Sequence, residues 1–230
     1  MKKVVLCFVF LFLSTLSLNV ISESAYATNF MTLHSFAGGA GDGEAPYGSL
    51  VLSRDGTTLY GMTDFGGSSS KGTIFCIPTI GGTLTVLHSF TGGASDGQWP
   101  GGNLTFSEDG TTLYGMTIAG GSVSSGTIFK IRTDGTGFEL LHTFTDSEYP
   151  EGSLILCNSV LYGMASGGGD HDLGVIFKIN TDGTGFTTLH SFSGDTSDGS
   201  SPHGSLTISG TTLYGMTYRG GELNMGVVLK

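Results

Sequence analysis

The chain has 230 residues, with 9 Lys and Arg against 19 Asp and Glu, and its formal net charge is −10 at pH 7. An acidic chain without a basic stripe is a poor partner for nucleic acid or for anionic membrane surfaces, because both carry negative charge. The hydrophobic content of 38% is enough for a packed core. We therefore expect a folded protein with no nucleic-acid partner.

Residues 1–27 have the features of a secretory signal peptide. Two lysines follow the initiator Met, residues 4–20 form an apolar run, and Ala-Tyr-Ala at 25–27 fits the pattern before a cleavage site. This predicts a secreted, extracellular mature chain, 28–230. The alternative is an uncleaved N-terminal anchor, although the apolar run is short for a membrane span. No later segment is apolar enough to cross a membrane, so we expect no span in the mature chain.

Most of the mature chain is a tandem repeat with a period of about 50 residues. Leu-Tyr-Gly-Met occurs at 59–62, 113–116, 161–164 and 213–216. Leu-His-Ser/Thr-Phe occurs at 33–36, 87–90, 141–144 and 189–192. The many glycines recur at fixed places in the repeat, which is typical of turns rather than of low complexity. We therefore expect one tandem-repeat domain over 28–230.

The second copy shows how one repeat is built. Asp-Gly pairs at 109–110 and 134–135 each separate two runs of β-forming residues. Such a pair is a strong hairpin signal, because Gly accommodates the positive φ of a tight turn. A Gly-rich loop joins the two hairpins. The four predicted strands are 102–106, 111–117, 127–131 and 138–144.

Four antiparallel strands at this period indicate an all-β fold, and specifically a β-propeller. We expect four blades, at about 48–90, 102–144, 152–192 and 204–230 plus 31–36. The N-terminal strand 31–36 then supplies the strand that the last blade lacks and closes the ring. Two alternatives remain open. One is a larger ring, completed by dimerisation or by repeats of a longer gene, and the other is an open solenoid, which would need polar capping repeats.

The recurring blocks resemble the GloVer tandem repeat of secreted bacterial proteins. The resemblance covers about residues 31–230 and lies in Leu-Tyr-Gly-Met-Thr, the Gly-Gly loop, Gly-Thr-Ile-Phe-Lys-Ile and Leu-His-Ser-Phe. It implies an exported protein without established activity, often tethered by a C-terminal sorting signal, and it implies no catalytic residues. This sequence ends at Lys230 without such a signal, so we expect free secretion or a truncated gene.

One histidine recurs in each repeat, and two cysteines follow the predicted signal peptide. The histidines are His34, His88, His142 and His190. On a propeller they would fall on a ring, so a four-histidine metal site is conceivable. The favoured interpretation is packing, because a copied repeat copies its packing residues. Cys76 and Cys157 occupy unrelated repeat positions, so we expect neither a disulfide nor a metal site from them.

Aspartates recur in the Asp-Gly loop that follows Leu-His-Ser-Phe. They are Asp42, Asp96 and Asp198, with Asp195 as an additional carboxylate in the fourth copy. Clusters of oxygen ligands suit calcium, so these aspartates are candidate calcium ligands. The favoured interpretation is an aspartate that bonds its own loop backbone, with no cofactor. Asp170-His171-Asp172, found only in the third copy, is a further metal candidate or a solvated loop.

The positions that vary on this constant frame are the best ligand-binding candidates. Beside the loop proline stand Tyr47, Trp99, Tyr149 and His203, and before the Gly-Gly loop stand Phe65, Tyr218 and Arg219. Rigid scaffolds usually carry recognition on loops. Aromatic side chains next to carboxylates and an arginine suit stacking on sugar rings with polar contacts around the rim. The alternative is a proline–aromatic contact that tightens the loop.

We therefore expect a secreted, non-catalytic binding or surface-interaction module. Its expected partner is an extracellular glycan or a cell-surface protein. One alternative is an extracellular polysaccharide-active enzyme, which would need two carboxylates at a suitable separation. Besides the Asp170–Asp172 loop, only Glu148 and Glu151 break the repeat symmetry in a way that would suit such a site. The other alternative is a purely structural surface protein.

Overall fold

The computed structural model describes residues 30–146 and 148–230. The chain divides into two compact units, Met1–Thr32 and Leu33–Lys230. Residues 30–32 form no regular structure, and the strands of the described residues all belong to the second unit. The predicted signal peptide 1–27 lies outside the described residues. Within the described ranges, no helix is long and apolar enough to span a membrane.

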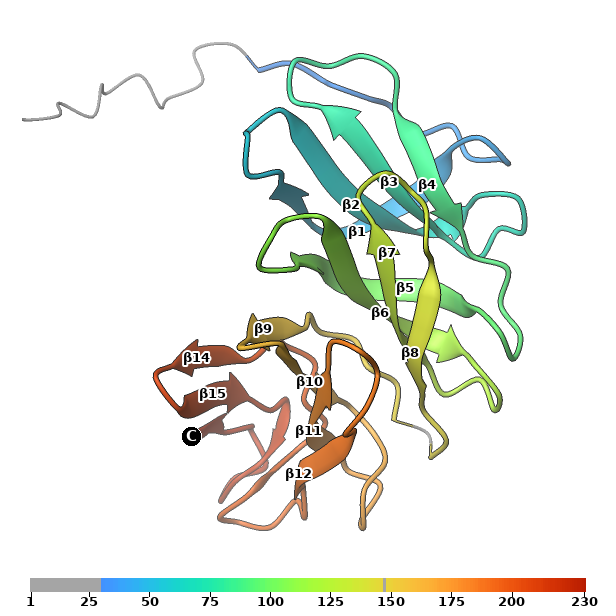
Figure 1. Cartoon of the computed structure of the whole chain (residues 1–230). Coiled ribbons are helices and arrows are strands. Elements are labelled where there is room, and N and C mark those ends of the chain that lie inside the picture. Colours follow the sequence, from blue (N-terminus) through green and yellow to red (C-terminus); the bar gives the residue numbers. More distant parts are fainter. Residues whose placement is uncertain (1–29, 147) are drawn as a thin grey trace, which may run out of the picture. The chain divides into compact units, whose positions relative to one another are not determined.

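Three of the repeats form four-stranded antiparallel sheets in which neighbouring strands follow chain order (Figure 1). The first contains β1 (Gly43–Leu52), β2 (Thr58–Gly66), β3 (Thr73–Pro78) and β4 (Thr85–Ser89). The second contains β5 (Gly97–Phe106), β6 (Thr112–Gly120), β7 (Thr127–Arg132) and β8 (Glu139–Thr143). The third contains β9 (Ile155–Cys157), β10 (Val160–Ala165), β11 (Val175–Asn180) and β12 (Thr187–Ser191). The predicted all-β fold of four-stranded repeats is confirmed in these three copies.

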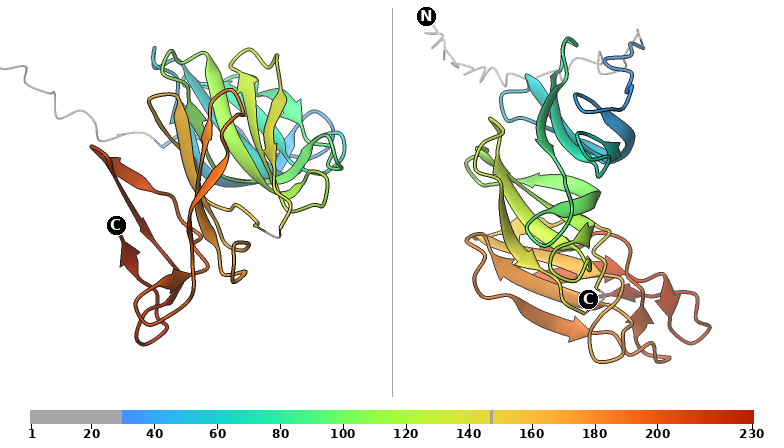
Figure 2. Two further views of the ribbon diagram at one scale, coloured as in Figure 1. Left: turned by 60° about the horizontal axis from the view of Figure 1, so that its bottom comes forward. Right: turned by 90° about the vertical axis from the view of Figure 1, so that its right-hand side faces the viewer.

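The fourth repeat has one strand fewer in its main sheet. That sheet contains β14 (Thr207–Ser209), β15 (Thr212–Met216) and β17 (Val228–Leu229), and β17 lies at its edge (Figure 2). A short ladder joins β13 (Gly199–Ser200) to β16 (Arg219–Gly220). Every strand pair is antiparallel, as hairpin connections require.

The hairpin turns form where the Asp-Gly pairs predict them. The Asp109 carboxylate accepts a hydrogen bond from the Thr111 backbone N–H at 3.0 Å, and Gly110 has a φ of +75°. Asp134 and Thr136 repeat this contact at 2.9 Å in the next hairpin. An aspartate that bonds the backbone two residues later stabilises a tight turn, so local sequence fixes the register of each hairpin.

Each sheet has two apolar faces with different side chains. We call one the methionine face, and in the first three repeats it consists of Tyr60, Met62 and Ile74, of Tyr114, Met116 and Ile128, and of Tyr162, Met164 and Ile176. We call the other the leucine face, and in the second to fourth repeats it consists of Leu104, Gly115 and Phe129, of Leu154, Gly163 and Phe177, and of Leu206, Gly215 and Leu229. The alternation of β-strand side chains separates the two sets.

The core lies between consecutive repeats, where the methionine face of one contacts the leucine face of the next. Met62 and Ile74 share a cluster with Leu104 and Phe129. The same pairing joins the second repeat to the third and the third to the fourth. Met62 is 3% exposed and Leu104 is also 3% exposed, so each contact excludes water from both faces.

Glycine in Leu-Tyr-Gly-Met is explained by the aromatic ring opposite it. Gly163 pairs with Phe177 across β10 and β11, and a Cβ on Gly163 would lie 2.5 Å from the Phe177 ring. Gly61 and Phe75 have the same relation in the first repeat, at 2.6 Å. The phenylalanine therefore lies over bare backbone, which lets the preceding repeat approach closely.

The first strands of consecutive repeats are also joined by hydrogen bonds. The Ser49 backbone N–H donates to the Asn103 side chain at 2.5 Å, and the Asn103 N–H donates to Ser153 Oγ at 2.8 Å. The Ser153 N–H in turn donates to Ser205 Oγ at 2.9 Å. One serine or asparagine per repeat thus links each repeat to the next.

The predicted N-terminal strand 31–36 and the ring closure that depends on it are not confirmed. Residues 31–36 form no strand, and Phe36 contacts Phe75 of the first repeat, with ring centroids 5.3 Å apart. Among the described residues, β17 forms a ladder only with β15, so its outer edge has no partner strand. The first two sheets begin earlier than the predicted starts at 48 and 102, because β1 starts at Gly43 and β5 at Gly97, and both strands include the loop proline. Cys76 and Cys157 are both free, as expected.

Replacing Gly163 with Ala tests the glycine–phenylalanine contact. We expect Gly163→Ala to lower the free energy of unfolding by roughly 1–3 kcal/mol, because the added methyl overlaps a buried ring. Gly215→Ala is the matched control, since its Cβ would meet the flexible ends of two leucines at 3.0 and 3.2 Å and of Met164 at 3.4 Å, but no aromatic ring. Urea unfolding of both variants measures the difference. Equal destabilisation by the two substitutions would contradict this account.

Candidate functional site

The predicted ligand-binding residues lie at one end of the sheets, where the first strand of a repeat begins and the second ends. In the first repeat Glu44 pairs with Phe65, and in the fourth Ser200 pairs with Arg219. The loop prolines and the Gly-Gly loops therefore come together at this end. Their variable side chains project from a frame that the packing between repeats holds fixed.

The aromatic residues beside the proline occupy two different repeat positions. Trp99 and Tyr149 precede the proline and have left-handed backbones, with φ of +56° and +45°. Tyr47 and His203 follow the proline. A left-handed non-glycine residue is uncommon and persists only where the surroundings hold it. Here the preceding repeat does so, because the Trp99 N–H donates to the Lys71 carbonyl at 2.9 Å.

Trp99 is partly covered by a cation. The Lys71 ammonium lies 5.5 Å from the centre of the Trp99 ring, and the tryptophan is 38% exposed. This cation–π contact fixes the ring while leaving much of it accessible. Tyr149 is 42% exposed, and its N–H donates to the Ser125 carbonyl at 3.2 Å. Sequence reasoning misses Lys71, because the lysine belongs to the Gly-rich loop of another repeat.

The densest group of chemically functional side chains joins the third and fourth repeats. We call it the His203 cluster, and it consists of Glu151, His203, Tyr218 and Arg219. His203 Nδ1 lies 2.5 Å from Glu151 Oε2, and its ring lies 5.7 Å from the Tyr218 ring. The Arg219 guanidinium lies 5.7 Å from the same tyrosine ring. Tyr218 is 66% exposed, so the cluster offers one aromatic face with three polar groups around it.

Glu151 is the member of this cluster that sequence reasoning does not assign to it. It follows its proline directly, as His203 follows the next one, so the two residues hold the same repeat position. Because residues in equivalent positions of consecutive repeats lie side by side, that shared position was the available signal.

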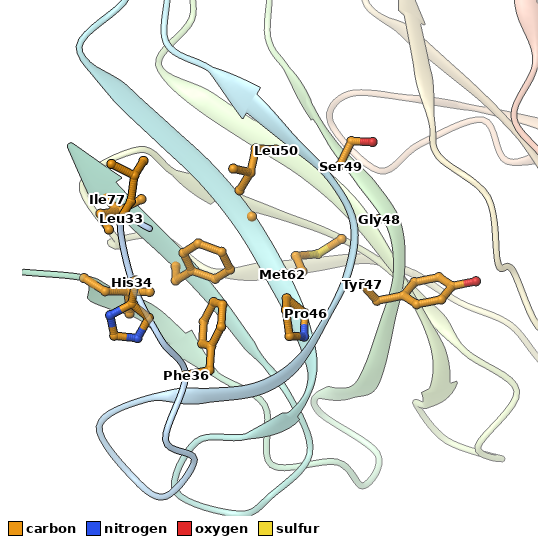
Figure 3. Close-up of a pocket in the computed structure, with 13 residues that line it drawn as sticks. Leu33, His34, Phe36, Pro46, Tyr47, Gly48, Ser49, Leu50, Met62 and Ile77 are labelled. Carbon is orange, nitrogen blue, oxygen red and sulfur yellow. The ribbon is translucent and has the colours of Figure 1, made fainter. Parts of the chain in front are cut away.

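The remaining two predicted residues lie in the first repeat. Tyr47 borders an apolar groove of 330 Å³ on the leucine face of the first sheet, together with Leu33, Phe36 and Leu50 (Figure 3). Phe65 is 43% exposed at the end of β2. The structure therefore gathers three of the seven predicted residues, His203, Tyr218 and Arg219, into the His203 cluster, while the other four lie elsewhere in the repeats.

The repeated histidines and aspartates pair with each other across the loop that leads into the first strand of a repeat. His34 Nε2 lies 3.0 Å from the Asp42 carboxylate. The same distance is 3.2 Å from His88 to Asp96 and 3.1 Å from His190 to Asp198. Each aspartate also accepts backbone N–H bonds from its own loop. Asp195 accepts from Ser193 Oγ at 3.1 Å. Among the described residues no three His, Cys, Asp or Glu side chains converge as a metal site would require.

These pairs have clear electrostatic consequences. Burial raises the pKa of Asp96, but hydrogen bonds from His88 and from the Thr91 backbone favour the charged carboxylate more strongly, so the pKa lies below its usual 3.8. His142 has no such ion pair among the described residues, although Asp146 stands four residues before its loop proline, as Asp96 does. His142 stacks on Phe186 with centroids 3.8 Å apart, and burial lowers its pKa.

The family model for the Gloeobacter/Verrucomicrobia repeat matches residues 20–229. The chain belongs to this family. The match confirms the resemblance to the GloVer repeat. No curated protein matches the sequence of this Gloeobacter/Verrucomicrobia repeat chain.

Two solved structures align with parts of this chain. A chain of a nidogen/laminin complex aligns with a TM-score of 0.50 at 19% identity, over 71% of this chain and 52% of that one. An oligogalacturonate lyase in complex with manganese aligns with a TM-score of 0.43 at 16% identity, over 64% and 43%. The Gloeobacter/Verrucomicrobia repeat chain thus spans about half the length of these structures. At 19% identity, the likeness to the nidogen/laminin chain shows a β-propeller-like fold alone.

The pairing of Asp96 with His88 predicts a pH dependence of stability. A folded pKa below the unfolded value gives stability that is present above the unfolded pKa and is lost as the pH falls through the folded pKa. Asp96→Asn should lower the free energy of unfolding at pH 7 by about 1–3 kcal/mol and flatten its decline below about pH 4. Urea unfolding at a series of pH values measures both effects.

Asp195→Asn is the control for this experiment, since Asp195 is exposed and outside the histidine pair. It should leave both the stability at pH 7 and the acid limb unchanged. If Asp96→Asn behaves like Asp195→Asn, the pair does not stabilise the loop.

Proposed function

We propose that this chain is an exported, non-catalytic binding module that recognises a glycan through the His203 cluster. The observation that carries the proposal is a contrast between two sets of residues. The packing residues recur from repeat to repeat, whereas the exposed side chains of the His203 cluster come together only where the third and fourth repeats meet. The histidine–aspartate pairs and the two faces recur from repeat to repeat, because they hold the fold. Tyr218 and Arg219 replace Asp64 and Phe65 of the first repeat, so the fold does not require them.

The chemistry of the cluster suits a sugar ring. The exposed Tyr218 ring provides an apolar, polarisable face on which the C–H side of a sugar can stack. Glu151 accepts hydrogen bonds from sugar hydroxyls, and Arg219 donates them in a fixed geometry. His203 is already held by Glu151 and Tyr218, so the polar rim is partly organised before a ligand arrives.

The N-terminal sequence supports the same proposal. The N-terminal residues 1–27 read as a signal peptide, and glycans are abundant partners outside the cell. Trp99 offers a second exposed aromatic ring at the equivalent end of the second sheet.

A polysaccharide-active enzyme is a second candidate because of Glu148. Burial raises the pKa of this carboxyl, as a general acid requires, and its Oε2 accepts the Asp146 N–H at 2.6 Å. Glu151, three residues later, would have to act as the second carboxylate. However, Glu151 is paired with His203, which leaves it less free to act as a base or nucleophile.

A glycan and polysaccharide binding screen tests the proposal. We expect reproducible binding that Tyr218→Ala weakens about tenfold or more, because the stacking ring is the centre of the site. Leu223→Ala is the control, since Leu223 is 78% exposed in the same repeat and outside the cluster. Unchanged binding by the Tyr218 variant would rule out this site, and Trp99→Ala shows whether the second ring contributes.

The same panel separates the alternatives. Release of soluble product, abolished by Glu148→Gln, would replace the binding module by an enzyme. A folded protein that neither binds nor cleaves any member would favour a structural role.

A further inference from the structure

The two ends of the repeat array expose faces that are buried everywhere else in the chain. In the fourth repeat the methionine face consists of Tyr214, Met216 and Val228. Met216 is 64% exposed and Val228 is 80% exposed, whereas Met116 and Ile128 at the same positions of the second repeat are fully buried. This face is apolar, and no repeat of the chain covers it.

In the first repeat it is the leucine face that no other repeat covers. Its leucine face is built on Leu50, which is 50% exposed. Leu104, Leu154 and Leu206 hold the same position in the later repeats and are 2–3% exposed, because the methionine face of the preceding repeat covers them. The groove beside Tyr47 and Phe36 is the visible part of this uncovered face (Figure 3).

A free strand edge accompanies each exposed face. In complete repeats the histidine strand pairs with the third strand, so that His88 lies opposite Ile74 and His190 opposite Ile176. The fourth repeat has no such strand beside β17. Leu33–Phe36 carries the Leu-His-Ser-Phe sequence of that strand, yet it belongs to no sheet.

We propose that a second copy of this chain docks head-to-tail, with its leucine face on the open methionine face of the fourth repeat. The three internal interfaces show what fits on such a face, and the only uncovered leucine face in the described residues is that of the first repeat. Leu33–Phe36 of the second copy completes the fourth sheet as the strand next to β17. Leu50 of that copy then lies against Met216 and Val228.

The internal repeats also fix the register of this pairing. The Phe90, Phe144 and Phe192 N–H groups donate to the carbonyls of Gly72, Gly126 and Gly174 at 3.0, 3.1 and 2.9 Å. The equivalent bond runs from Phe36 of the second copy to Gly226, with His34 opposite Val228. A groove of 780 Å³ between His190 and Leu213 receives the start of the added strand. In the second repeat, Phe138 lies four residues before His142 and stacks on His88 of the first repeat. Phe30 has the same sequence position, four residues before His34.

Such an interface is heterologous, because different surfaces of the two copies meet. It forms a closed ring if the rotation closes and a linear chain of copies if it does not. The two exposed faces can therefore be blocked one at a time, which makes the proposal sharply testable.

The experiment measures the mass of the full chain in solution by light scattering. We expect the wild type to be a dimer or larger at about 100 µM, where an interface with a micromolar dissociation constant is occupied. Leu50→Asp and Val228→Asp should each reduce the mass to that of a monomer. Because each variant keeps one intact face, an equimolar mixture of the two should form a heterodimer.

Val123→Asp is the matched control, since Val123 is 57% exposed in a loop of the second repeat and should leave the wild-type mass unchanged. Both test positions are exposed in the single chain, so thermal unfolding should show that the variants remain folded. A wild type that is monomeric at this concentration would overturn the proposal and would favour closure within one chain. Variants that stay monomeric when mixed would overturn it in favour of a symmetric interface.

Discussion

The contact between a methionine face and the next leucine face determines how this protein folds, because a single four-stranded sheet has no core of its own. A lone sheet of this size is marginally stable and must bury a face against a neighbour. Here Phe129 lies over the bare backbone of Gly115 and contacts Met62 and Ile74 of the previous repeat. Larger residues at the glycine would lift the ring and separate the sheets. Most of the residues that recur in the repeat therefore serve this contact between neighbouring sheets.

The histidine–aspartate pair fixes the connecting loop relative to the packed strands. His88 belongs to β4, which ends one repeat, while Asp96 directly precedes β5, which begins the next. Their bond closes the connecting loop, and the aspartate also holds the loop backbone. As a result the proline that follows, and the exposed residues beside it, have a fixed position. The packing between repeats thus positions the strands, the histidine–aspartate pair positions the loop, and the loop positions the residues of the candidate site.

Much of the fold could be predicted from the sequence, because hairpins and periodic strands depend on local signals. Asp109-Gly110 fixed a turn, and the recurrence of Leu-Tyr-Gly-Met fixed the repeat. Ring closure could not be predicted in this way, since it depends on the rotation between sheets, which no residue pattern records. The His203 cluster was only partly predictable: His203 and Tyr218 stood out as variable aromatic or polar positions, but their contact with Glu151 requires two repeats to lie side by side.

The end faces and the His203 cluster are linked by the geometry of the fourth repeat. Tyr214, Met216 and Tyr218 alternate along one strand direction, so the exposed ring of the cluster continues the line of the open methionine face. Residues that follow the proline in consecutive repeats lie side by side, as Glu151 and His203 do. A second copy docked head-to-tail would therefore bring its Tyr47 next to His203. The site would gain a second exposed aromatic ring, so its affinity for an extended ligand would depend on assembly as well as on its own side chains.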